Sequence, residues 1–180
     1  MTYLKANEDV NLFVKDWGSG KTVVFIHGWP LNHKCYEYQF TMLPQFGLRC
    51  ISLDLRGYGD SDKPCGEYDY NMYADDLLMI LRNLNLYDVT LVGHSMGGAI
   101  ILRYLTRHAN ERVSKAILVG AAAPCFTQRE DYPYGFTKET VDQFLDLCYS
   151  DRAQLLKNCG KIFFYTEKSV SPKFADWFQN

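Results

Sequence analysis

Apolar residues up to Gly120 gather in short runs that end at glycine, proline or aspartate. Four of these runs do not alternate strictly with polar residues: TVVFI at 22–26, CISL at 50–53, VTLV at 89–92 and VSKAILV at 113–119. Short runs of this kind are typical of parallel strands that are covered on both faces. An earlier run at 10–14 leads into the turn-rich segment WGSG and also predicts a strand.

The residues between these strands recur with the period of a helix. One apolar stripe consists of Tyr73, Leu77, Ile80, Leu81 and Leu84, and the charged Asp75, Asp76 and Arg82 lie off it. A second stripe, after residue 95, consists of Ile100, Ile101, Tyr104 and Leu105. Strands that alternate with helices indicate right-handed β-α-β crossovers. The pattern therefore predicts an α/β fold with a doubly wound, mostly parallel sheet.

The pattern changes after Gly120. Residues 124–136 contain two prolines, a glycine and four aromatic residues, and residues 138–149 carry one apolar helical face. The aromatic run KIFFYTEK at 161–168 then precedes a last helical stretch that ends at 175–178. We therefore divide the chain into an incomplete α/β core at 1–123 and a partial helical cap or lid at 124–180.

The composition is that of an ordinary globular protein and excludes a disordered or fibrous chain. Of 180 residues, 47% are hydrophobic and 22% are charged, and the formal net charge is −2. Because positive charge is not in excess, we expect neither nucleic acid nor an anionic membrane as a partner. No apolar run reaches the ~20 residues of a membrane helix, and the first ten residues show no secretory signal. The six cysteines form no C-x-x-C pair, so we expect free thiols and a cytoplasmic location, with disulfides as the alternative.

One motif carries catalytic chemistry. Residues 93–98 read GHSMGG, directly after the strand at 89–92 and directly before the second helical stripe. This is the G-x-S-x-G nucleophile elbow in its strand-turn-helix context, with glycines where a sharp turn leaves no room for a Cβ atom. Ser95 is the candidate catalytic nucleophile, held at the C-terminal edge of the sheet. The alternative is a glycine-rich turn whose serine only caps the helix.

A second motif, HGWP at 27–30, follows the strand at 22–26. A loop in this position contributes a backbone N–H to the oxyanion hole of such a site. The candidate donors are the N–H groups of Trp29 and Met96, the latter at a helix N-terminus that also favours negative charge. We expect the side chains of both residues to line the pocket. The alternative for HGWP is an ordinary turn at the end of a strand.

Four segments in this order resemble the α/β-hydrolase superfamily: HGWP at 27–30, DLRGYGDSDKP at 54–64, GHSMGG at 93–98 and GAAAP at 120–124. Within that superfamily they are similar to the cofactor-free branch of haloperoxidases, perhydrolases and aryl esterases. The match runs along almost the whole chain.

The resemblance implies a serine esterase that acts on small carboxylic esters through an acyl-enzyme, with no cofactor and no metal. Members of this branch often also make peracids from short carboxylic acids and hydrogen peroxide. The resemblance gives Asp54 and Arg56 a structural role in the loop after the fourth strand. Related dehalogenases and epoxide hydrolases attack with a carboxylate, so a serine at position 95 favours acyl transfer.

The acid and the base of a catalytic triad are missing from the sequence. In this fold the acid, and after it the histidine, follow the serine along the chain. Only His108 lies downstream, and thirteen residues of helix would carry it about 20 Å from Ser95. We expect His27 and His94 to be structural, and His33 to approach the mouth of the pocket if it takes part at all. No downstream carboxylate ends a predicted core strand.

Two interpretations stay open. The chain is either a C-terminally truncated serine hydrolase or a catalytically incomplete module that is retained for binding. In both cases the strand at 113–119 becomes an exposed sheet edge, through which we expect self-association or pairing with another chain. The aromatic residues of the cap either form an apolar acyl or aryl pocket or only pack among themselves: Phe126, Tyr132, Tyr134, Phe136, Phe163, Phe164 and Tyr165.

Overall fold

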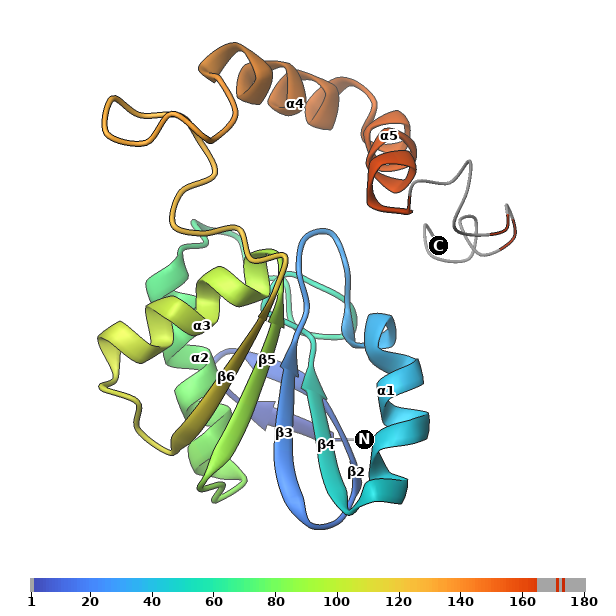
Figure 1. The fold of residues 1–180 in the computed structure, drawn as a ribbon, viewed down its shortest axis with the longest axis vertical. Coiled ribbons are helices and arrows are strands. Elements are labelled where there is room, and N and C mark those ends of the chain that lie inside the picture. Colours follow the sequence, from blue (N-terminus) through green and yellow to red (C-terminus); the bar gives the residue numbers. More distant parts are fainter. Residues whose placement is uncertain (1, 165–170, 172, 174–180) are drawn as a thin grey trace. The chain divides into compact units, whose positions relative to one another are not determined.

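A computed structural model describes residues 2–164, 171 and 173, and the chain divides into two compact units, Met1–Pro124 and Cys125–Asn180. The first unit is built on a six-stranded sheet (Figure 1). Its strands are β1 (Thr2–Lys5), β2 (Asn11–Gly18), β3 (Lys21–Ile26), β4 (Leu48–Leu53), β5 (Val89–His94) and β6 (Val113–Val119). They lie in the order β1-β2-β4-β3-β5-β6.

The sheet is parallel from β4 through β3 and β5 to β6, and only β1 and β2 run antiparallel to their neighbours. All five strands predicted from the apolar runs are present, and the doubly wound, mostly parallel α/β fold is confirmed. The short strand β1 was not predicted. Its residues, TYLK, are mostly exposed and form no apolar run, so pairing with β2 rather than burial makes this segment a strand.

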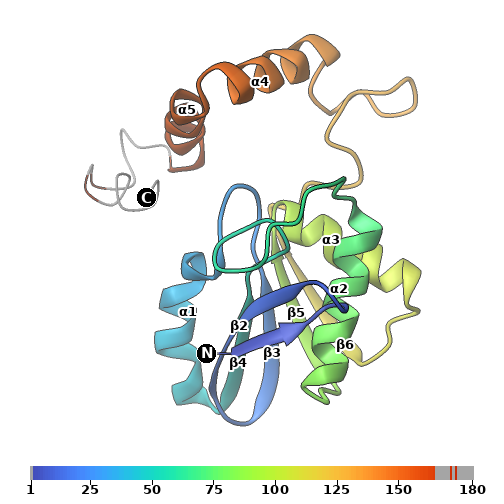
Figure 2. The ribbon, with the colours of Figure 1, turned by 180° about the vertical axis from the view of Figure 1, so that it is seen from behind.

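Helices cover both faces of the sheet (Figures 1 and 2). One side carries α1 (Glu37–Met42) between the 3₁₀ turns η1 (His33–Tyr36) and η2 (Leu43–Phe46), and the other carries α2 (Tyr70–Asn83) and α3 (Met96–Arg107). Alternate residues of β3 enter two separate buried clusters. Val24 and Ile26 pack with α2 and α3, whereas Val23 and Phe25 pack with Tyr36 of η1 and its neighbours. Burial on both sides explains why this strand is a continuous apolar run.

The predicted stripe of α2 is buried, but one charged residue departs from the prediction. Asp69 caps the helix by accepting the N–H of Met72 at 2.7 Å. Asp76, expected off the buried face, is only 3% exposed. Its carboxylate accepts two hydrogen bonds from Arg56, at 2.6 and 3.0 Å, and this partner in the loop after β4 allows a charge to be buried.

Strand β6 forms an edge of the sheet, as expected. Among the described residues it pairs only with β5. Its apolar side chains Ile117, Leu118 and Val119 are 51%, 42% and 47% exposed. The edge therefore presents both unpaired backbone groups and apolar surface.

The second unit contains two helices, α4 (Lys138–Ser150) and α5 (Arg152–Phe164). Helix α4 matches its prediction and is capped by Thr137, whose hydroxyl accepts the N–H of Thr140. The run KIFFYTEK begins inside α5, a helix that the sequence pattern did not predict. The last predicted helical stretch, ending at 175–178, lies outside the described residues.

Aromatic residues of the second unit pack on one another. The ring centroids of Phe126 and Phe136 are 5.0 Å apart, and those of Phe136 and Phe144 are 5.8 Å apart. Tyr134 is 84% exposed. The role of residues 124–180 as a cap stays a prediction. In the described part of the chain, no helix combines the length and apolar character needed to cross a membrane.

Candidate active site

Ser95 stands at the turn between β5 and α3 in a strained backbone conformation. Its φ of 52° and ψ of −116° lie in a region that serine rarely adopts. The Ser95 N–H donates to the carbonyl of Val119 at 3.0 Å, and the Ser95 carbonyl accepts the N–H of Ala122 at 2.9 Å. The hydroxyl makes no capping hydrogen bond to α3, so the alternative of a merely capping serine does not hold.

The elbow, residues 93–98, has glycines where other residues would collide with backbone. A Cβ on Gly93 would lie 2.5 Å from the carbonyl oxygen of Gly97. A Cβ on Gly97 would overlap the carbonyl oxygen of Ile26, at the end of β3. The elbow is therefore pressed against the neighbouring strand, which holds the turn in its strained form.

The β3 loop, residues 27–33, crosses directly beside the nucleophile. A Cβ on Gly28 would lie 2.9 Å from the Cβ of Ser95 and 2.9 Å from the carbonyl oxygen of His94. Trp29 is the next residue after Gly28. The fold thus brings the HGWP and GHSMGG segments together, as their motifs require.

His27 is fully buried at the start of this loop. Its Nδ1–H donates to the carbonyl of Gly28 at 2.9 Å, and its Nε2 accepts the N–H of Leu55 at 3.0 Å. Burial lowers the pKa of His27 to about 4. Both ring nitrogens of a neutral imidazole are therefore occupied, which makes His27 a structural residue.

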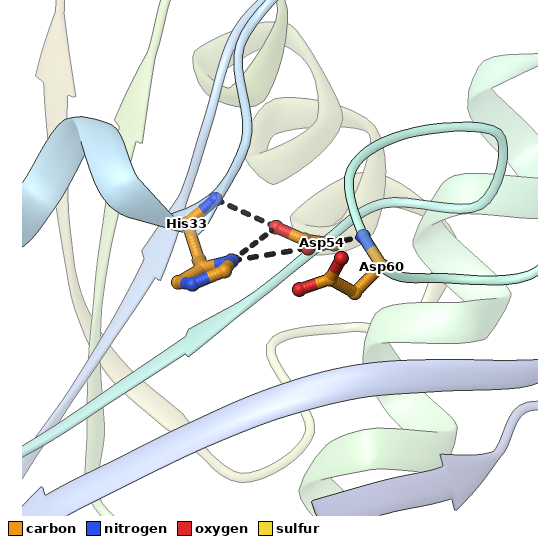
Figure 3. Close-up of side chains that lie close together, drawn as sticks. All are labelled: His33, Asp54 and Asp60. Atoms are coloured by element: carbon orange, nitrogen blue, oxygen red, sulfur yellow. Dashed lines mark hydrogen bonds and ion pairs between the residues drawn. The ribbon is translucent and has the colours of Figure 1, made fainter. Parts of the chain in front are cut away.

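His33 lies at the other end of the β3 loop and binds Asp54 (Figure 3). Its backbone N–H donates to Asp54 Oδ1 at 2.6 Å, and its Nδ1 lies 2.9 and 3.0 Å from the two carboxylate oxygens. The ring also packs on Phe13 of β2, with centroids 4.7 Å apart. In the sheet, β4 and β3 separate β2 from β5, the strand that leads into Ser95.

Asp54 also accepts a hydrogen bond from within its own loop, the loop after β4. It is fully buried and also accepts the N–H of Asp60 at 2.8 Å. Burial alone would raise the pKa of this carboxyl, but the hydrogen bonds from His33 and Asp60 outweigh it and hold the pKa below its usual value. The sequence motif indicated a structural role for Asp54 but gave no sign of His33, which lies on a different loop.

His33, Asp54 and Asp60 are the one group in the described part of the chain whose potential metal-ligand atoms converge, within 4.8 Å of one another. The hydrogen bonds account for this convergence, because the carboxylate of Asp54 already accepts N–H groups from both of its neighbours. We therefore interpret the group as a hydrogen-bonded anchor.

The loop after β4 also reaches the elbow. The ring of Tyr58 packs edge-on against His27, with centroids 5.3 Å apart, and its hydroxyl points at the sulfur of Met96, at 4.0 Å. The ring of His94, the residue before Ser95, lies beside Gly28, and burial lowers its pKa. His108 follows the last turn of α3, at the opposite end of that helix from Ser95, with Nε2 2.9 Å from a carboxylate oxygen of Asp75.

A strained serine between a parallel strand and a helix, with a glycine loop against it, is the geometry of a hydrolase of the α/β class. Comparison with protein families agrees: the model of the alpha/beta hydrolase fold matches residues 21–151. The chain belongs to this family.

Comparison with individual relatives shows which branch of the family this chain resembles. The chain is 50% identical to the AB hydrolase superfamily protein YisY of Bacillus subtilis and 38% identical to a non-heme haloperoxidase of Rhodococcus erythropolis, over 99% and 92% of its length. It is 33% identical over 99% of its length to the bifunctional esterase/perhydrolase DCH of Acinetobacter calcoaceticus, of which it covers 67%. The resemblance to haloperoxidases and esterases is thus confirmed.

A solved structure shows the same fold. An esterase from Exiguobacterium antarcticum matches 99% of this chain with a TM-score of 0.94 and 46% identity, and 66% of that esterase is covered. The chain likewise spans 66% of the length of YisY and 60% of the Rhodococcus haloperoxidase.

Proposed function

We propose that this chain carries the nucleophile and the oxyanion hole of a serine hydrolase that cleaves small carboxylic esters. The observation that carries the proposal is the strained conformation of Ser95, with the β3 loop packed against it. The esterase and haloperoxidase relatives support an enzyme and do not favour the alternative of a non-catalytic binding module.

In the proposed mechanism the hydroxyl of Ser95 attacks the ester carbonyl and loses its proton to a base. The carbonyl oxygen becomes an oxyanion, which accepts hydrogen bonds from the N–H groups of Trp29 and Met96. The tetrahedral intermediate expels the alcohol and leaves an acyl group on Ser95. Water then releases the acid. Hydrogen peroxide in place of water would release a peracid, the reaction expected of a perhydrolase.

We propose further that the acid and the base of the triad do not belong to this chain. The positions of its histidines support this view. Both nitrogens of His27 are occupied, His33 packs near β2, and His108 lies at the far end of α3. A base supplied from outside these residues would complete the site.

Acetylation of Ser95 by p-nitrophenyl acetate tests the proposal. Loss of the triad histidine costs about a million-fold in kcat in a well-characterised serine protease, so we expect very slow turnover. Both steps use the base, but nitrophenolate is a far better leaving group than the alkoxide of Ser95, so acylation should outpace deacylation. Acetyl-Ser95 should therefore accumulate and be detected by peptide mass mapping.

The Ser95→Ala variant is the control, because lysines and cysteines also react with this ester. Acetylation confined to those side chains, with none on Ser95, would contradict the proposed nucleophile. Fast turnover that disappears in Ser95→Ala would instead show that the base lies within this chain.

A further inference from the structure

The β3 loop is held at both ends by histidines, and the two histidines bind consecutive residues. At the start of the loop, His27 accepts the backbone N–H of Leu55 through Nε2. At its end, His33 binds the carboxylate of Asp54 through both its backbone N–H and its ring. Between them, the N–H of Leu31 donates to the carbonyl of Gly28 at 2.9 Å and closes a turn that contains Trp29.

Asp54 is itself fixed to the sheet. Its backbone N–H donates to the carbonyl of Phe13 on β2 at 2.9 Å, and its carbonyl accepts the hydroxyl of Ser61 at 2.6 Å. The Ser61 hydroxyl also accepts the N–H of Phe13 at 2.9 Å. Gly59 packs so closely that a Cβ there would overlap the carboxylate of Asp54. The carboxylate therefore has little freedom to move or to change partners.

We propose that Asp54 is a positioning residue for catalysis, which acts through His33 to place the Trp29 amide at the oxyanion. This inference rests on the proposed function, because it gives Asp54 a part in the same oxyanion hole. Gly28 touches the elbow on one side, and Figure 3 shows His33 anchored to Asp54 on the other. A donor gains most when it is held in place before charge develops, so a loop fixed between these two contacts stabilises the transition state.

The Asp54→Asn variant tests this role. An asparagine has one oxygen acceptor, whereas the backbone N–H groups of His33 and Asp60 bind different oxygens of Asp54. The NH₂ group would therefore face an N–H donor and loosen one of the two loops. We expect faster hydrogen exchange of the amides at 28–33, by about tenfold or more, with the amides of β3 and β5 unchanged. The acetylation rate of Ser95 should fall by about 10²-fold, close to the loss of one oxyanion donor.

Asp62→Asn is the matched control in the same loop. Asp62 accepts both the N–H and the side-chain amide of Asn11 through a single oxygen, at 2.7 and 3.0 Å. An asparagine retains that oxygen, so both readouts should match the unsubstituted chain. If Asp54→Asn does not fold, His33→Ala provides a second test. It removes the ring's bond to Asp54 and its packing on Phe13 but retains the bond of the backbone N–H, so it should give a smaller effect in the same direction.

The outcomes separate the two proposals. Unchanged exchange at 28–33 and unchanged Ser95 acetylation in folded Asp54→Asn would overturn the positioning role. Faster exchange spread over the whole sheet, with equal effects of Asp54→Asn and Asp62→Asn, would show a general structural role and overturn it as well. If Ser95 of the unsubstituted chain does not react at all, the proposed function fails, while exchange at 28–33 still decides whether Asp54 positions the loop.

Discussion

Two histidines show how strongly the surroundings of a residue determine its chemistry. His27 and His33 bracket one loop, yet they use their rings differently. His27 is a neutral ring that both donates and accepts, and burial lowers its pKa to about 4. His33 instead points its Nδ1 at a carboxylate. Neither ring makes a hydrogen bond to Ser95 in the described structure, as a catalytic base would have to.

The lowered pKa of His27 predicts destabilisation by acid. The unfolded chain binds a proton on this residue near its ordinary pKa of 6.5, whereas the folded chain binds it only near 4. The contribution of His27 to stability is therefore complete above about pH 6.5 and is lost as the pH falls toward 4, by about 3 kcal/mol in all. Urea unfolding at several pH values from about 7 to about 4.5 measures this slope. In His27→Gln the slope should be shallower, and an equal slope in both chains would contradict the assignment.

At the level of single residues, short sequence motifs located more of the candidate site than the periodic pattern of apolar residues did. The glycines around Ser95 marked the elbow because only a residue without a side chain fits against Ile26 and Gly97. The bond between His33 and Asp54 was not predictable, since it joins two loops that are 21 positions apart and neither residue belongs to a periodic pattern. The burial of Asp76 was missed for the same reason, because its partner Arg56 lies outside the helix.

Helix α2 carries two neighbouring aspartates that each bind an arginine with both oxygens. Asp76 binds Arg56 of the loop after β4, and their side chains are 4% and 12% exposed. Asp75 binds Arg107 of α3, and theirs are 45% and 38% exposed. Burial raises the pKa of Asp76 and outweighs the opposite effect of Arg56. The two pairs have the same chemistry but differ in contact with solvent.

Removing the charge of each aspartate should therefore have unequal effects. Asp76→Asn leaves the guanidinium of Arg56 buried without its counter-charge, and we expect a loss of about 3–5 kcal/mol in the free energy of unfolding. Asp75→Asn breaks a pair that water already screens, so its effect should be much smaller. Urea denaturation of both variants makes the comparison. Equal losses would show that burial does not determine the strength of these pairs.

At the level of elements, strands covered on both faces were predictable and lightly covered segments were not. β3, β4 and β5 are apolar because helices lie on either side of them. β1 forms through pairing with β2, and α1 and its flanking turns are too short for a periodic pattern. The apolar run of β6 predicts a strand as well, yet this strand is largely exposed. An apolar run thus indicates that a strand is suited to burial on both faces. The structure shows whether the described residues actually cover it.

At the scale of the whole molecule, β6 forms an open edge of the sheet in the part of the chain that the structure describes. The carbonyl of Val119 accepts the N–H of Ser95, so the backbone groups of Val119 face β5. Alternate residues of a strand direct these groups to opposite sides. Those of Leu118 and Ala116 therefore face the open side, whereas the alternation is interrupted at Ser114 by a shift in the pairing with β5. An antiparallel pair of β6 strands centred on Ala116 would join these groups and place Lys115 opposite Ile117 of the other copy, away from its like charge.

We therefore expect this chain to self-associate through β6 in solution. Size-exclusion chromatography with light scattering should show dimers or larger species that increase with concentration. Ala116→Pro removes one outward N–H without touching the bonds to β5, and an edge strand tolerates proline at such a position. This variant should shift the chain toward monomers, whereas Ala116→Ser retains the N–H and should not. A soluble, stable monomer of the unsubstituted chain would contradict the expectation. It would show that the exposed apolar side chains of β6 do not drive association.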